Sequence, residues 1–402
     1  KREIEKKLKI NVPNKILLIA EAIRKKINLK KIYKLSKVDP WFLEQIKEIV
    51  DYENNILKKG LPKNFNEFNK IKSIGFSDKK LSQLSGLKEK IVRRNRLALN
   101  IVPLFKKIDT CAAEFKSFTP YMYSTYQRNF MSKKECEADP STKKKVIILG
   151  GGPNRIGQGI EFDYCCCQAS FSLKAAGYET IMVNCNPETV STDYDTSDRL
   201  YFEPLIEEYV HNIILKEKSK GNLLGVIAQF GGQTPIKLAK FLHENSLPIL
   251  GTQYSSIDLA EDRDRFRKLL IKLKLKQAES GIAKSYKEAI KIANKIGLPL
   301  IVRPSYVLGG RAMEIVHEKN QLKNFVEEAF KAAENNPILI DKFINNAMEV
   351  DVDAISDGNQ VFVAGIMQHI EEAGIHSGDS ACCLPPIAIK EKLIIEIKNQ
   401  TK

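Results

Sequence analysis

Between residues 146 and 250, short apolar runs alternate with segments long enough to form a helix. The apolar runs occupy residues 146–149, 180–183, 226–228 and 249–250, and glycine lies close behind several of them. Short buried strands that alternate with helices are typical of a parallel, doubly wound sheet. We therefore expect an α/β domain here, with ligands bound at the carboxyl ends of its strands.

The preceding part of the chain has a different periodicity. Residues 1–130 contain apolar residues at helical spacing, for example in 16–23 and 41–50. Asp39-Pro40 is a helix start signal, and residues 59–62 form a turn cluster. Residues 131–145 are polar and turn-rich, which marks a domain boundary. We expect an all-α module over residues 1–140.

After residue 262 the pattern changes again. A helix is predicted for 263–275, and a hairpin for 300–302 and 313–316 with a glycine-containing loop between them. A further strand is predicted for 337–344, and Asp357-Gly358 is a good turn between strands at 350–354 and 361–363. The predicted class is multidomain: the all-α module, a doubly wound domain over 141–262, and an antiparallel α+β domain over 263–402.

Composition indicates the kind of cellular compartment in which the chain works. The chain has 402 residues, 43% of them hydrophobic, which is enough for two or three cores. No apolar run reaches the roughly 18 residues of a membrane span. Of the eight cysteines, residues 165–167 and 382–383 are consecutive, and no pair has the spacing of a zinc site. We expect free thiols, a reducing compartment and therefore a soluble, cytoplasmic protein.

The positive charge is concentrated at one end. Residues 1–145 hold 35 Lys and Arg against 16 Asp and Glu, whereas the rest of the chain carries a net charge of −4. A nucleic-acid-binding arm would explain such an excess. The lysines are scattered among acids without interleaved aromatic residues, which favours solvated helix faces instead.

Two loops could contact phosphates. Residues 150–159 follow a strand and are rich in glycine, so their N–H groups could face an anion, although a structural tight turn explains them as well. No Gly-Lys-Ser/Thr follows, so this is not a P-loop. Arg303 leaves a strand and offers a rigid fork to phosphate oxygens, and Gly309 and Gly310 give the next loop freedom to close. An ordinary hairpin with a surface arginine is the alternative.

Two further segments could complete a nucleotide site. The strand at 337–344 could present its backbone to adenine, with Glu349 taking ribose hydroxyls; a plain core strand is the alternative. Residues 374–380 concentrate glycine, serine and His376, which suits phosphate oxygens. A lone histidine is more often structural, and Glu371 and Glu372 could be solvated charges.

Several of these runs match one family in order and spacing. They are residues 150–164, 183–202, 231–235, 303–314, 349–353 and 374–380, joined by 39–43, 109–115 and 121–126 in the helical part. The chain resembles the large subunit of carbamoyl-phosphate synthetase, from its helical connecting domain into its C-terminal half. The resemblance covers nearly the whole chain and is strongest over residues 146–386.

The resemblance implies a reaction and partners. The full subunit of this family has two ATP-grasp units joined by a helical oligomerisation domain. The first unit makes carboxyphosphate from bicarbonate and ATP. Ammonia from a glutaminase, either a small subunit or a fused domain, converts it to carbamate, which the second unit phosphorylates with another ATP. The residues here would belong to the second unit, with a preATP-grasp domain at 141–262 and a partial ATP-grasp domain at 263–402. We expect homo-oligomers through the helical domain, no activity from this segment alone, and no nucleic-acid or membrane partner.

The resemblance also implies the residues of the site. ATP contacts carry over to Arg263, Arg303, Gly309, Gly310, Lys342, Ile344, Glu349, Gly374, Ile375, His376 and Ser377, with Arg303 also catalytic. Lys342 stands where similar sequences often carry histidine, although a backbone contact to the base would survive that change. The cofactors implied are ATP and Mg²⁺, with Mn²⁺ and K⁺ as alternatives. No metal ligand is expected in this segment, and the metal-binding segment is expected C-terminal to Lys402.

Two other functions remain open. Another ATP-grasp ligase, such as a biotin-dependent carboxylase, would share the nucleotide features, although the run at 184–202 argues against it. The basic helical module could alternatively dock RNA or an acidic partner.

Overall fold

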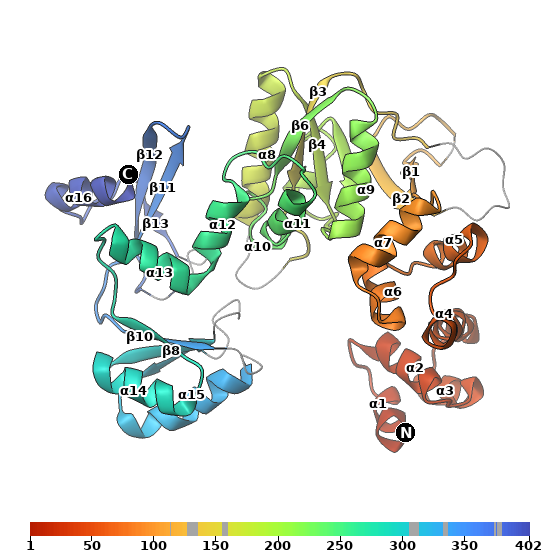
Figure 1. Ribbon diagram of the computed structural model, residues 1–402, viewed down its shortest axis with the longest axis horizontal. Helices are drawn as coiled ribbons and strands as arrows, with labels where there is room; N and C mark the ends of the chain where they lie inside the picture. The colour runs from red at the N-terminus through yellow and green to blue at the C-terminus, as the bar shows by residue number, and fades with distance from the viewer. Residues whose placement is uncertain are drawn as a thin grey trace. The chain divides into compact units, whose positions relative to one another are not determined.

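The computed structural model describes residues 1–112, 114–126, 136–154, 160–304, 313–332, 337–373, 375 and 380–402 (Figure 1). The chain divides into two compact units. The first unit comprises residues 1–147, 173–187 and 194–224, and the second comprises residues 148–172, 188–193 and 225–402.

The first unit begins with seven helices. They are α1 (Arg2–Leu8), α2 (Lys15–Arg24), α3 (Leu29–Ser36), α4 (Pro40–Lys59), α5 (Phe65–Ser73), α6 (Asp78–Ser85) and α7 (Glu89–Ala98). The predicted start of α4 is confirmed, because the Asp39 carboxylate accepts a hydrogen bond from the Trp41 N–H at 2.8 Å. The helix ends at Gly60, whose φ of 76° a residue with a side chain adopts only at a cost.

Two apolar cores hold these helices together. The first joins α1 to α4 through Leu8, Ile19, Ile32, Leu43 and Val50, all of which are buried. The second joins the end of α4 to α5, α6 and α7 and contains Ile56, Phe68, Ile71, Phe76, Leu81, Val92 and Ile101. The long helix α4 therefore contributes to both cores.

The prediction of helix throughout residues 1–130 is wrong after α7. Strands β1 (Leu104–Lys107) and β2 (Tyr121–Thr125) pair with each other in antiparallel fashion, and β2 pairs with β5 (Arg199–Phe202) in parallel. Buried Phe105 packs edge-on against the ring of buried Tyr201, with ring centroids 5.1 Å apart. This long-range pairing decides the conformation of a segment whose local pattern does not specify it.

The sheet that contains these strands has six members in the order β1-β2-β5-β4-β3-β6. Strands β3 (Lys144–Leu149) and β4 (Glu179–Asn184) occupy the predicted positions, and β6 (Asn222–Ile227) begins four residues before the predicted run at 226–228. Residues 249–250 contribute only a bridge from Ile249 to Val226. The intervening helical segments are α8 (Ile160–Ala175), η1 (Val190–Thr192), α9 (Glu207–Lys218), α10 (Gln233–Ile236), α11 (Ala239–Glu244) and α12 (Tyr254–Glu261).

A buried cluster of charges joins the helical module to α9. Its members are Lys72, Asp78, Arg96 and Glu208, whose side chains are at most 2% exposed. Lys72 Nζ lies 3.1 Å from Asp78 Oδ1 and 2.6 Å from Glu208 Oε1. The Arg96 guanidinium donates to both carboxylate oxygens of Asp78. Two positive and two negative groups balance, which is the condition under which buried charges are tolerated.

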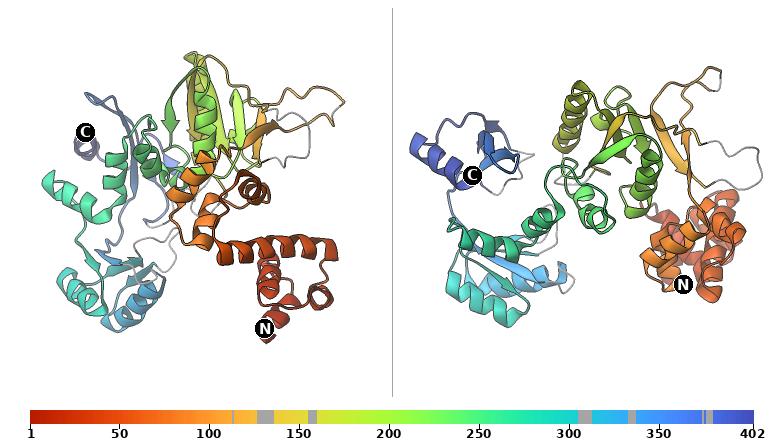
Figure 2. Two further views of the ribbon diagram at one scale, coloured as in Figure 1. Left: turned by 45° about the vertical axis from the view of Figure 1, so that its right-hand side comes forward. Right: turned by 45° about the horizontal axis from the view of Figure 1, so that its top comes forward.

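The end of the second unit contains two antiparallel sheets. The first has the order β7 (Ser280–Ala283), β10 (Ile338–Lys342), β8 (Leu300–Pro304) and β9 (Glu314–Val316). Helices α14 (Tyr286–Ile296) and α15 (Lys319–Ala332) pack on it around buried Val302, Val326 and Ile340 (Figure 2). The second sheet has the order β11 (Val350–Ser356), β12 (Val361–His369) and β13 (Cys382–Cys383).

Both predicted hairpins are confirmed. Strand β8 pairs with β9, and β11 pairs with β12 across the turn at Asp357-Gly358, where Gly358 has a φ of 92°. Helices α13 (Arg263–Lys272) and α16 (Glu391–Thr401) complete the unit. Within the described ranges, none of the helices is both long and apolar enough to cross a membrane.

Candidate functional site

Arg303 and Asp341 project from neighbouring strands of the sheet that contains β8 and β10. The register pairs Arg303 with Leu339, so Asp341 lies diagonally opposite on the same face. Arg303 Nη2 lies 2.6 Å from Asp341 Oδ2. The two groups are not aligned for a hydrogen bond, and the buried atoms Arg303 Nε and Asp341 Oδ2 have no hydrogen-bond partner in the described part of the chain. The Arg303–Asp341 pair therefore does not use all of its hydrogen-bond donors and acceptors within the described part of the chain.

A pocket of about 340 Å³ opens beside this pair. Its apolar wall includes Phe266 and Leu270 of α13 and Leu339 of β10, while Gln277 and Ser280 add polar groups. Arg267 also lines the pocket, and its buried Nε has no hydrogen-bond partner among the residues the structure describes. Two guanidinium groups with unused donors beside an apolar wall suit an anionic group attached to a flat ring.

The residues present fit ATP in this respect. A nucleoside triphosphate needs cationic donors for its phosphate oxygens and an apolar surface for its base. The guanidinium groups of Arg303 and Arg267 meet the first requirement, and Phe266 and Leu270 provide an apolar surface beside them. The site is built on strands and a helix, which hold their side chains more firmly than loops do.

The side chain of Lys342 is committed elsewhere. Its Nζ donates to the carbonyl oxygens of Leu298 at 2.8 Å and Gly297 at 3.3 Å, and its N–H donates to the Glu279 carbonyl. A contact from Lys342 to a base would have to use its own carbonyl. The Ile344 N–H has no hydrogen-bond partner among the described residues, so it is available to a base.

A second pocket, of about 420 Å³, brings Ile344 to the segment before residue 374. Ile344 and Phe343 line it together with Glu372 and Ala373. Ile375 follows directly and is 42% exposed. The structure therefore places two predicted site segments around one hollow, although they are about 30 residues apart in the sequence.

The Glu371 carboxylate accepts hydrogen bonds from two residues at the end of the glycine-rich segment. Its Oε2 accepts hydrogen bonds from the Ser380 hydroxyl at 2.8 Å and from the Ala381 N–H at 2.6 Å. The hydroxyl contact lowers the pKa of this carboxyl below its ordinary value. Glu349 precedes β11, and its carbonyl accepts the His369 N–H at 3.0 Å. Glu371 therefore has two hydrogen-bond partners in the chain and is more than a solvated charge.

Several predicted positions cannot be placed. Gly309, Gly310, Gly374, His376 and Ser377 lie outside the described residues. The backbone of Arg263 begins α13, which is capped by the Asp262 carboxylate, but the side chain of Arg263 is also outside the described part.

The glycine loop after β3 is anchored by a residue that motif reasoning did not single out. Asp163 Oδ1 accepts the Gly151 N–H at 2.9 Å, and its Oδ2 accepts the Thr189 hydroxyl. A Cβ at Gly231 would lie 2.3 Å from the Gly150 carbonyl oxygen, so only glycine fits there. The sequence feature that could have pointed to Asp163 is its position within the run 150–164 that matches the family.

Sequence reasoning also missed Asp341, Arg267 and the His369–Asp351 pair. His369 Nε2 lies 2.9 Å from Asp351 Oδ2 across β11 and β12. These partners depend on strand register and helix placement, which the sequence pattern does not specify. In the described ranges, no cluster of three or more His, Cys, Asp and Glu side chains could hold a metal ion.

Family models match three consecutive stretches of the chain. Residues 1–100 match the carbamoyl-phosphate synthetase large chain oligomerisation domain. Residues 142–259 match the carbamoyl phosphate synthase preATP-grasp domain. Residues 262–402 match the carbamoyl-phosphate synthase L chain ATP binding domain.

Individual proteins agree with these matches. The chain is 53% identical over 410 residues to the carbamoyl phosphate synthase large chain of Rhizobium meliloti, covering 97% of this chain and 35% of that protein. It is 53% identical over 403 residues to the Neisseria meningitidis serogroup A large chain, covering 100% of this chain and 37% of that protein. The chain spans about a third of the length of the curated relatives it matches.

Among solved structures, N5-carboxyaminoimidazole ribonucleotide synthetase from Thermus thermophilus matches with a TM-score of 0.46 and 16% identity, over 64% of this chain and 62% of that one. The family matches are therefore the informative ones, because they cover the three parts of the chain in succession. The chain belongs to the carbamoyl-phosphate synthase large-chain family, of which it carries the oligomerisation, preATP-grasp and ATP-binding domains.

Proposed function

We propose that this chain supplies the ATP site of an ATP-dependent ligase that makes carbamoyl phosphate from bicarbonate, ammonia and two ATP. Within that ligase, the chain serves the half that phosphorylates carbamate. The observation that carries the proposal is the pair of guanidinium groups, Arg303 and Arg267, that line one pocket beside the apolar wall of α13. The family match over residues 262–402 supports ATP as the occupant.

The proposal assigns a role to each predicted site residue. Arg303 binds the oxygens of the phosphoryl group in transfer and offsets the charge that develops on them. The carbonyl of Lys342 and the N–H of Ile344 bind the base, and Glu349 takes the ribose. The expected ATP contacts of Arg263, Gly309, Gly310, Gly374, Ile375, His376 and Ser377 remain part of the proposal. ATP supplies the phosphoryl group once it is bound.

The setting of the whole protein is also proposed. Mg²⁺, with Mn²⁺ or K⁺ as alternatives, neutralises the triphosphate. A glutaminase, separate or fused, supplies ammonia, and subunits associate through the helical domain at residues 1–140. The preATP-grasp domain spans 141–262 and the ATP-grasp domain 263–402. The eight free cysteines fit a reducing compartment, namely the cytoplasm.

The decisive experiment uses Arg303→Met in the complete large chain with its glutaminase. Bicarbonate-dependent ADP formation without ammonia reports the first phosphorylation, and carbamoyl phosphate formation reports both. We expect the variant to keep the first activity and lose carbamoyl phosphate formation by at least about 100-fold, since a charged hydrogen bond to the transferring group contributes roughly 1.5–3 kcal/mol or more.

The matched control is Arg265→Met, which removes a half-exposed guanidinium that pairs with Asp258 outside the pocket. It should leave both activities within about twofold, because surface pairs contribute about 0–1 kcal/mol. Loss of the bicarbonate-dependent step in Arg303→Met, with carbamoyl phosphate formation limited by that step, would assign this site to the other half.

Two simpler assays separate the remaining alternatives. Residues 1–402 alone should bind ATP without making carbamoyl phosphate, because the chain matches a single ATP-binding domain and the reaction uses two ATP. Full synthesis by this chain would refute that part of the proposal. Biotin-stimulated ATP hydrolysis would instead point to a carboxylase.

A further inference from the structure

A groove of about 1090 Å³ runs along α4 in the helical module. One wall is a single face of that helix, formed by Pro40, Leu43, Glu44, Lys47, Val50, Asp51, Asn54 and Lys58. These positions recur at intervals of three and four residues, so they form one continuous stripe. The stripe is about 27 Å long at 1.5 Å per residue.

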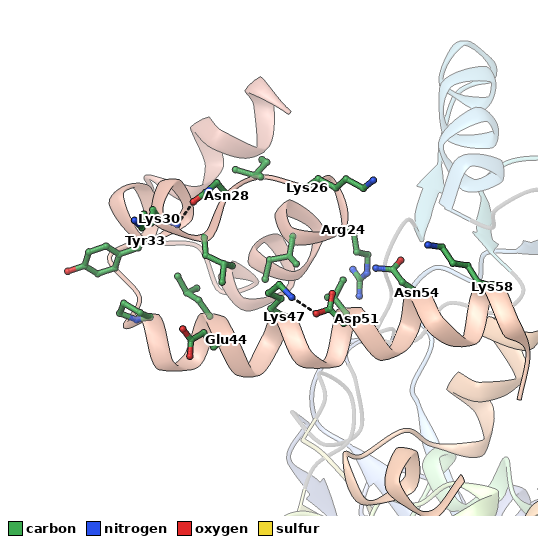
Figure 3. A pocket seen from close by; sticks show the side chains of 16 residues that line it. Arg24, Lys26, Asn28, Lys30, Tyr33, Glu44, Lys47, Asp51, Asn54 and Lys58 are labelled. Carbon is green, nitrogen blue, oxygen red and sulfur yellow. Dashed lines mark hydrogen bonds and ion pairs between the residues drawn. The ribbon is translucent and has the colours of Figure 1, made fainter. Parts of the chain in front are cut away.

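The opposite wall comes from the end of α2, the following loop and the start of α3. It contains Ile23, Arg24, Lys26, Ile27, Asn28, Leu29, Lys30 and Tyr33. In Figure 3, Asn28, Lys30 and Tyr33 lie across from the part of α4 that carries Glu44, and Arg24 lies near Asp51 and Asn54. At the bottom of the groove, the core residues Ile23, Ile27, Leu43 and Val50 are at most 9% exposed, and Leu29, Tyr33 and Pro40 add apolar surface that is more exposed.

The rim of the groove is positively charged. Five lining residues are cationic, namely Arg24, Lys26, Lys30, Lys47 and Lys58, and two are acidic, Glu44 and Asp51. Lys47 pairs with Asp51, and Arg24 pairs with Glu53 and Glu21. No ion pair involves Lys26, Lys30 or Lys58 within the described ranges, so these three ammonium groups are available to a partner.

We propose that this groove binds an amphipathic helix of another polypeptide chain, with acidic residues beside its apolar stripe. An apolar floor between two helical walls is the usual receptor for such a helix. The uncompensated lysines at the rim select negative charge and align the helix. This proposal is independent of the reaction proposed above, because no residue of the groove belongs to the ATP site.

A second copy of this chain fits the groove less well. Residues 1–145 carry a net charge of +19, so a second helical module would bring like charge to this groove, and the association of subunits proposed above would use other faces of the module. The amphipathic helix α16, which buries none of its residues, carries Glu391 and Glu396 but also Lys392 and Lys398. It therefore supplies no net negative charge to the three lysines.

The test uses a designed 18-residue helical peptide with a leucine stripe and glutamate at the remaining positions, since 18 residues match the length of the groove. Its affinity for the complete 402-residue chain is measured by fluorescence anisotropy. The variant K26E/K30E/K58E should bind the peptide at least tenfold more weakly. Tyr33→Ala, which shortens an exposed side chain of the groove wall, should weaken binding about threefold or more with unchanged thermal unfolding.

The matched control is K34E/K63E/K79E, which makes the same charge change at exposed lysines of the same module outside the groove. It should change the affinity less than threefold. A scrambled peptide of identical composition should bind at least tenfold more weakly, because it lacks the apolar stripe.

Three results would overturn the proposal. The first is equal weakening by the two triple variants, which would mean diffuse attraction to a basic protein. The second is equal binding of the scrambled peptide. The third is a change of oligomeric state in K26E/K30E/K58E by sedimentation velocity without peptide binding to the original chain, which would assign the groove to a second copy.

Discussion

Two arginine–aspartate pairs in this chain have the same chemistry and opposite surroundings. Arg96 and Asp78 are fully buried, and Arg96 Nε and Nη2 donate to the Asp78 carboxylate while Nη1 donates to the Ile101 carbonyl at 2.8 Å. Arg303 is 39% exposed and touches Asp341 through one oblique contact. Its buried Nε has no hydrogen-bond partner in the described part of the chain.

The difference separates a structural pair from a pair that can bind a ligand. Buried charges are stable only when every donor and acceptor is used, because each unpaired group costs free energy. The Arg96–Asp78 pair meets this condition. Lys72 also forms ion pairs with Asp78 and Glu208. The Arg303 pair lies beside a pocket and does not use all of its hydrogen-bonding groups within the described part of the chain. A ligand in that pocket can therefore form hydrogen bonds that the protein itself does not supply. The number of hydrogen bonds is therefore more informative than the residue types.

The largest effect should come from breaking the buried pair. Asp78→Ala leaves Arg96 and Lys72 buried with too little negative charge, so the free energy of unfolding should fall by about 3–5 kcal/mol. Urea unfolding followed by the fluorescence of Trp41, the single tryptophan of the chain, reports this module directly.

The control is Asp51→Ala, which breaks an exposed pair with Lys47 on α4. It should cost about 0–1 kcal/mol. A loss below about 1 kcal/mol in Asp78→Ala would mean that water replaces the carboxylate, and the contrast between the two arginines would not hold.

An intermediate effect is expected at the other pair. Asp341→Asn removes a negative charge beside Arg303, so a triphosphate should bind more tightly by about 1 kcal/mol, which is about fivefold. Titration with ATP measures this, and Asp258→Asn, which loses an exposed partner of Arg265, is the control. Weaker binding in Asp341→Asn would show that the carboxylate positions Arg303 rather than competing for it.

A further effect concerns pH. Burial, together with Arg93 and Arg96, lowers the pKa of His211 on α9 to about 4. Because the unfolded chain takes up this proton near pH 6.5, the stabilising contribution is complete above that value and is lost as the pH falls towards 4. His211→Gln should therefore reduce the loss of stability between pH 6.5 and 4.5 measured by Trp41 fluorescence.

A second buried group acts in the opposite direction. Burial raises the pKa of Glu203 to about 7, so its contribution is present at low pH and is lost as the pH rises from about 4.5 to 7. Glu203→Gln should therefore make the chain relatively more sensitive to acid. An unchanged pH profile in both variants would mean that His211 and Glu203 titrate in the folded chain as they do in the unfolded chain.

The sequence predicted the parts of the fold that local patterns encode. The Asp39-Pro40 start of α4, strands β3 and β4, and the turn at Asp357-Gly358 each depend on neighbouring residues. Strands β1 and β2 were missed, because their conformation depends on pairing with β5, about 80 residues away. Of the predicted site residues, Arg303 and Ile344 line pockets, whereas the Lys342 side chain is bound to two carbonyls of the loop before β8.

The partners of these residues could not be predicted. Asp341 reaches Arg303 only through the register of β8 and β10, and Arg267 reaches the pocket only through the placement of α13. Asp163 meets Gly151 and Thr189 through loops that come together after folding. A motif identifies residue types that can do chemistry, but contacts between distant segments decide what each side chain does.

The buried charge cluster also constrains the order of events during synthesis. Lys72 precedes Glu208 by 136 residues, and Asp78 precedes it by 130. At about 5–20 residues per second, Lys72 waits roughly 7–27 s for its partner to be translated. During that interval Lys72 lacks its shortest ionic contact, and Glu208 is not yet present to accept the Asp78 N–H. The helical module therefore reaches its final packing only after α9 has emerged, so its maturation on the ribosome depends on a segment made much later.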